Sequence, residues 1–171
     1  MFKTLYTKLA GTTIIIMIIS GLLSFILSNY YYQHKFKPEN DEKITNIALE
    51  MAHYIEQAQP PDLHTYLNNI AEIGYHLYLV DEDHHESFFG DPFRETTLPA
   101  ETIDLVLNGE IYHGIKQFPQ RTFVTGFFAN ELINSIGVPF THADTQYGLF
   151  IRPNLKLLFN EMHFLLAWML L

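Results

Sequence analysis

Nine histidines and 19 acidic residues make metal binding the first chemistry to consider in this chain. The densest cluster is the run DEDHHE from Asp81 to Glu86, whose carboxylates and imidazoles are suitable ligands for a divalent cation. Adjacent residues at a turn rarely converge on one ion without partners from elsewhere, so the run favours a solvated hairpin turn. The chain has no HExxH motif, no cysteine and no EF-hand loop, and we predict no metal site.

Sequence signatures of catalysis are also missing. There is no GxSxG nucleophile elbow and no phosphate-binding Walker loop, and the serines and histidines are scattered. We therefore predict no catalytic residue in this chain.

Aromatic side chains are abundant, with 14 Phe and 10 Tyr. Core packing is expected to use most of them, but Phe128 and Phe159 could also offer apolar surface to a flat, amphiphilic ligand. Arg152, in the sequence FIRP, and His163 could bind the carboxylates of such a ligand. Alternatively, Arg152 makes a surface ion pair or a lipid-headgroup contact, and His163 marks the membrane interface.

The segment that must position these residues is an apolar run near the N-terminus. Residues 9–29 contain no charge and, at about 1.5 Å per residue, can cross a hydrocarbon core of about 30 Å. Tyr6 and the tyrosines at 30–32 flank the run as an interfacial belt, and no cleavage site follows it, which predicts an uncleaved anchor. The apolar run 164–171 predicts the truncated start of a second transmembrane helix, with a buried terminal helix as the alternative.

Charge is distributed unevenly along the 171 residues. All 19 acidic residues lie at or after Glu39, against six basic ones between Glu39 and Glu161. Such a domain repels nucleic acid, so nucleic-acid binding is excluded. The short N-terminal tail followed by an acidic domain predicts a cytoplasmic N-terminus and an extracellular domain. We expect a cytoplasmic tail at 1–8, a transmembrane helix at 9–32, a sensor domain at 33–156, and an exit helix with the start of a second transmembrane helix at 157–171.

Apolar spacing predicts the elements of the domain. Steps of three and four predict helices at 41–59 and 63–71, and YHLYLV predicts a strand at 75–80 with a hairpin return at 87–89. Pro99 predicts the start of another helix, which Gly109 ends. Strand-like runs follow at 111–118, 122–128, 135–140 and 147–151, and a helix is expected from Asn154. This order predicts an α+β domain of the PAS-like or Cache-like type, in which a long N-terminal helix and further helices cover one face of an antiparallel sheet.

Five separated motifs resemble one family. The motifs MFKTLY, GDPFRETTL, YHGIK, FVTGFF and FIRP, in this order, are similar to those of the haem-sensing membrane histidine kinases of Gram-positive bacteria. The resemblance implies two membrane helices around an extracellular sensor, a homodimer in the cell membrane, and a full-length protein that is a kinase. It also implies that this chain lacks the catalytic core and that ATP binds only in the missing kinase region. Phosphate would pass to a response regulator that switches on haem efflux.

Haem at the junction between membrane and sensor domain is then the expected ligand. We predict that its apolar edge lies near Phe25, Tyr30, Phe128 and Phe159 and its propionates near Arg152 or His163. Axial ligation by His or Tyr is possible in such a site. Two other functions stay open. One is a sensor of a metal or of envelope stress, in which DEDHHE would act, and the other is a membrane-anchored interaction domain without signalling.

Overall fold

The chain begins with α1 (Leu5–Tyr31), a helix with no buried residue. The structure, a computed structural model, describes residues 4–117 and 130–154. Thr4 caps the start of α1, because its side chain accepts a hydrogen bond from the backbone N–H of Thr7. In the part of the chain that the structure describes, one helix is long and apolar enough to cross a membrane, and α1 is its apolar part. This agrees with the transmembrane helix predicted from the sequence.

Helical conformation continues from Leu5 to Ala58. After α1 come a short π-helix, η1 (Tyr32–Phe36), and a second α-helix, α2 (Lys37–Ala58). The chain divides into two compact units, Met1–Pro38 and Glu39–Leu171. The domain described below belongs to the second unit.

The predicted helices at 41–59 and 63–71 are confirmed. They correspond to α2 and to α3 (Leu63–Glu72), whose apolar residues at steps of three and four are buried. The Asp62 side chain accepts a hydrogen bond from the backbone N–H of Thr65 and so caps the start of α3.

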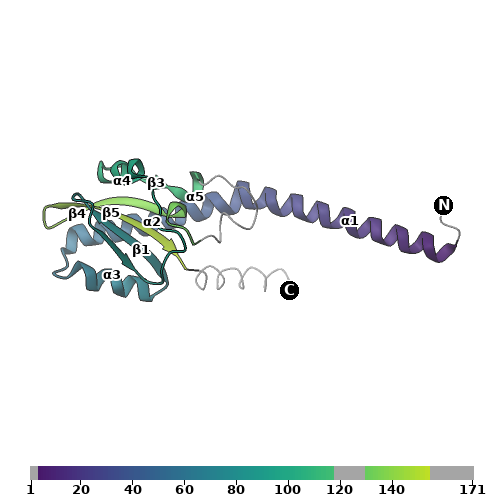
Figure 1. Cartoon of the computed structure of the whole chain (residues 1–171), viewed down its shortest axis with the longest axis horizontal. Helices are drawn as coiled ribbons and strands as arrows, with labels where there is room; N and C mark the ends of the chain where they lie inside the picture. The colour runs from purple at the N-terminus through teal and green to yellow at the C-terminus, as the bar shows by residue number, and fades with distance from the viewer. Residues whose placement is uncertain (1–3, 118–129, 155–171) are drawn as a thin grey trace. The chain divides into compact units, whose positions relative to one another are not determined.

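Five strands form one antiparallel sheet in the order β2-β1-β5-β4-β3. Strands β1, β3, β4 and β5 are labelled in Figure 1. Their bounds are β1 (Tyr75–Asp81), β2 (Glu86–Phe89), β3 (Tyr112–His113), β4 (Ile136–His142) and β5 (Thr145–Pro153). The hairpin β1–β2 and the two late strands β4 and β5 were predicted. Strand β1 pairs along its whole length with the central strand β5, from Tyr75 opposite Pro153 to Asp81 opposite Tyr147.

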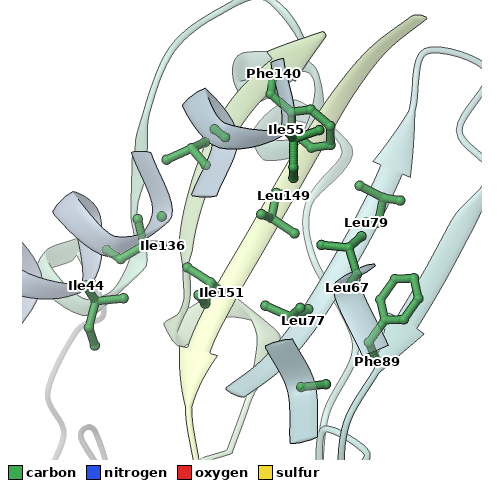
Figure 2. Close-up of a cluster of buried hydrophobic side chains, with 14 of the residues drawn as sticks. Ile44, Ile55, Leu67, Leu77, Leu79, Phe89, Ile136, Phe140, Leu149 and Ile151 are labelled. Carbon is green, nitrogen blue, oxygen red and sulfur yellow. The ribbon is translucent and has the colours of Figure 1, made fainter. Parts of the chain in front are cut away.

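Side chains on the two faces of the sheet build two separate cores. On one face, α2 and α3 pack their apolar stripes against residues such as Leu77, Leu149 and Ile151 (Figure 2). On the other face, Val106 of α4 (Ala100–Leu107) packs with Tyr78 and Phe150. The predicted covering of one face by helices is therefore confirmed by α2 and α3, and α4 covers the other face as well. Because β1 alternates between two buried faces, its sequence is apolar almost throughout.

The predicted strand at 111–118 is mostly wrong. Within its described part, residues 111–117, only β3 is a strand, and α5 (Gly114–Gln117) follows it directly. A Cβ atom at position 114 would collide with the backbone oxygens of Ile133 and Ser135, which flank the end of the short 3-10 helix η2 (Leu132–Asn134). Only glycine fits this close approach, at the point where the strand changes to helix. The predicted strand at 122–128 and the helix expected after Asn154 lie outside the described residues.

Candidate ligand site

Arg152, the residue predicted to bind carboxylates, lies inside the domain. It occupies the penultimate position of β5 opposite His76, and it is only 4% exposed. Its guanidinium N–H at Nη1 donates a hydrogen bond of 2.6 Å to the backbone oxygen of Asn134. This burial does not fit a surface ion pair or a lipid-headgroup contact.

His76 fixes the loop beside Arg152. Its Nδ1 lies 2.6 Å from the backbone oxygen of Asp91, and because a carbonyl can only accept, Nδ1 carries the proton in this contact. The His76 ring also lies 5.6 Å from the ring of Phe93, centroid to centroid. Asp91 and Phe93 of the GDPFRETTL motif thus contact β1 through His76, which gives these two residues a structural role.

A cavity of about 320 Å³ opens next to this loop. Most of the residues that line it are polar, among them Glu72, Asp91, Asn68 and Asn154. Two acidic residues disfavour the propionates of haem, and a mainly polar lining offers little of the apolar surface that a porphyrin needs. We conclude that this cavity is unsuitable for haem.

The C-terminal end of α1 presents aromatic surface in the first unit. Phe25 is 59% exposed and Tyr30 is 65% exposed. The ring centroids of Tyr30 and His34 lie 4.4 Å apart, one helical turn from each other along the chain. The predicted ligand residues Phe128, Phe159 and His163 lie outside the described residues. The predicted haem contacts therefore stay predictions.

The DEDHHE turn is organised around one of its own carboxylates. Asp81 accepts hydrogen bonds from the backbone N–H groups of Asp83 and His85 and lies 3.0 Å from the His85 ring nitrogen. Partial burial alone would raise the pKa of Asp81, but these hydrogen bonds outweigh it and hold that pKa below its ordinary value. Across residues 4–117 and 130–154, no three His, Asp or Glu side chains are grouped so that they could hold a metal ion.

Two features of the described chain were not foreseen. His113 of β3 contacts the carboxylate of Asp41 at 2.9 Å and so connects the sheet to the first turns of α2. The turn from Tyr32 to Phe36 is π-helical rather than α-helical. Neither feature has a local sequence motif, although Pro38 shortly after the π-helix is a signal for a disturbed helix.

Comparison with known proteins identifies the family. A family model described as the HssS heme sensor protein N-terminal domain matches residues 4–159. Proteins named Heme sensor protein HssS from Staphylococcus haemolyticus (strain JCSC1435) and Staphylococcus aureus (strain Newman) are 38% and 39% identical over all 171 residues of the chain. The chain covers 38% and 37% of their lengths, and no solved structure matches it significantly. Because one model covers both α1 and the described domain, the chain belongs to the family of HssS heme sensor protein N-terminal domains.

Proposed function

We propose that this chain is the sensor region of a membrane histidine kinase that detects excess haem. The observation that carries the proposal is the family match over residues 4–159, because it includes the apolar helix and the sensor domain together. Relatives that match the whole chain are named Heme sensor protein HssS. In the proposed protein, the sensor controls autophosphorylation in a homodimer and phosphate transfer to a response regulator for haem efflux. ATP binds in the kinase region that follows the chain.

The architecture supports an extracellular sensor of the PAS-like or Cache-like type. The domain combines a long N-terminal helix with a five-stranded antiparallel sheet, as expected for such folds. The apolar helix α1 is the first membrane anchor, and a second helix after Asn154 returns the chain to the cytoplasm. The domain then lies on the outer side of the cell membrane.

The proposed haem site lies at the junction between the membrane helices and the domain. The exposed rings of Phe25 and Tyr30 support an apolar wall on α1, completed by Phe128 and Phe159. The propionates reach Arg152 or His163, and a buried guanidinium is well suited to them because a charged hydrogen bond is stronger away from water. The acidic lining of the cavity beside Gly90 argues against a site there.

A haem titration tests where this site lies. We expect haem to bind the whole chain in lipid nanodiscs, with a shifted Soret band, and to bind residues 36–156 alone at least about tenfold more weakly. The difference is expected because the fragment lacks the apolar wall of α1. Equal affinity for both would contradict a site at the membrane junction. No saturable binding to either would contradict direct haem recognition.

Arg152 can be tested with a control for stability. Arg152→Met keeps much of the apolar stem but removes the charge, and we expect about a tenfold or greater loss of haem affinity. Val106→Ala, in the core under α4, is the matched control, because it lowers stability without changing charge. An Arg152→Met variant that binds haem no worse than Val106→Ala would remove Arg152 from the site.

A further inference from the structure

A single π-helical turn, η1, lies between α1 and α2. In η1 the backbone N–H of Lys37 donates to the oxygen of Tyr32, five residues earlier. The helix on either side is α-helical. π-Helical turns are rare, and where they occur they are frequent at functional sites. Each holds one residue more than the α-helical turn that it replaces.

The sequence explains why the widened turn is here. Pro38 has no N–H to donate to the oxygen of His34, and inside an α-helix its ring collides with that oxygen. A wider turn before Pro38 relieves this collision. The turn also carries ring contacts at a spacing of four residues: Tyr30 with His34 at 4.4 Å, and Tyr32 with Phe36 at 6.0 Å between centroids. The collision with Pro38 raises the free energy of the α form, and the wider hydrogen-bonded turn raises that of the π form relative to an ordinary helix, so the two penalties oppose each other.

We propose that this turn is the two-state element of the sensor, in which Tyr32–Phe36 converts between π- and α-helix. Conversion takes up or releases one residue. It therefore turns the helix after Pro38 by about 100° relative to the helix before Tyr32 and changes its length by about 1.5 Å. The helix then has two discrete arrangements, and a ligand that binds one of them more tightly shifts the population toward it. This inference rests on the proposed function, because it supplies the movement that haem would bias.

Two variants lock the two registers. Pro38→Ala removes the collision and makes the turn α-helical with all residues retained. Pro38→Ala combined with deletion of Gln33 is also α-helical. Because it has one residue fewer, it keeps the rotation of the helix after Pro38 that the π turn provides. We choose Gln33 because, among residues 4–117 and 130–154, its side chain makes no hydrogen bond, ion pair or ring contact. Gln33→Ala and Pro61→Ala are the controls, one for the side chain and one for a proline outside the helix.

The full-length kinase in nanodiscs is assayed for autophosphorylation with and without haem. In both locked variants we expect the ratio of the autophosphorylation rates with and without haem to fall to about one. The rate without haem should be high in one variant and low in the other. The controls keep the wild-type ratio. A normal haem response in Pro38→Ala would overturn the inference, because the π turn would then only accommodate the proline. Equal basal rates in the two locked variants would also overturn it.

Backbone hydrogen exchange of the 171-residue chain separates this inference from the proposed function. We expect the amides from Phe36 to Lys37 to exchange faster than the flanking helix, and Pro38→Ala to slow them to the rate of that helix. Unchanged exchange in Pro38→Ala would overturn the inference even where haem responds normally. If wild-type kinase ignores haem but exchange and basal rates shift as expected, the proposed ligand is wrong and the two-state turn stands.

Discussion

Gly90 connects the end of β2 to the loop that His76 holds. It has a positive φ of +87°, and a Cβ atom there would lie 2.6 Å from the backbone oxygen of Tyr75. We expect Gly90→Ala to destabilise the domain by about 2–4 kcal/mol, because strained backbone and overpacking each cost about 1–3 kcal/mol. Urea unfolding of the chain in detergent, followed by near-UV circular dichroism, measures the change.

Gly109 is the matched control for this substitution. Its φ is also positive, at +97°, but no atom lies within 4 Å of the Cβ position. Gly109→Ala should therefore cost only the backbone strain, about 1–2 kcal/mol. Equal losses in the two variants would show that the contact with Tyr75 relaxes freely.

Asp81 makes the stability of the β1–β2 turn depend on pH. Its folded-state pKa lies below the ordinary value of 3.8 because of the hydrogen bonds from His85 and Asp83. The stability that this carboxylate contributes is therefore present above about pH 4 and is lost as the pH falls through the lowered pKa. We expect Asp81→Asn to lower the melting temperature at pH 7 and to make little difference near pH 2.

Asp83→Asn is the control for this pH series. Asp83 lies in the same turn, and in the described part of the chain its carboxylate accepts no hydrogen bond. Its substitution should leave the melting temperature unchanged at both pH values. If Asp81→Asn and the wild type differed by the same amount at pH 2 and pH 7, the effect would not come from the charge of Asp81.

At the scale of elements, Asp41 and His113 connect α2 to β3. One carboxylate oxygen of Asp41 contacts His113, and the other is buried without a hydrogen-bond partner in the described structure. We expect His113→Ala to cost about 1–3 kcal/mol, because it leaves a buried carboxylate unpaired. Adding Asp41→Ala should recover part of that loss. Strictly additive losses in a double-mutant cycle, measured by urea unfolding, would show that the two side chains do not interact.

Elements with local causes were predictable from the sequence. Helix α3 has its cap at Asp62, an apolar stripe and a terminal glycine, and its bounds were close to those expected. In contrast, α5 depends on the approach of Gly114 to the backbone around Ile133, almost twenty residues away. The burial of Arg152 depends likewise on the oxygen of Asn134, which no local pattern indicates.

The widened turn was missed for a different reason. Its residues Tyr32 to Phe36 are compatible with an ordinary helix, and the hydrogen-bond register of a helix leaves no periodic signal in five residues. The signal that could have found it is Pro38, read as a residue that disturbs the turn before it. The predicted haem contacts at Phe25 and Tyr30 depend on the position and orientation of the bound haem, which side-chain types alone do not specify.

At the scale of the whole molecule, the two cores should be sufficient to fold the sensor domain. Every residue of both clusters lies between Ile44 and Ile151. We expect residues 36–156, expressed without α1, to unfold in one cooperative transition seen equally by far- and near-UV circular dichroism. Separate transitions for the two signals would show that the domain depends on α1 for its packing.

The position of β5 has a mechanical consequence. This strand lies in the centre of the sheet, with seven register pairs to β1 and seven to β4, and the chain leaves it at Asn154. A pull on Asn154 along the axis of β5 loads the hydrogen bonds of both ladders in shear at the same time. Edge strands such as β2 can instead be peeled away one bond after another. Tension at Asn154 therefore displaces the sheet as one stiff body.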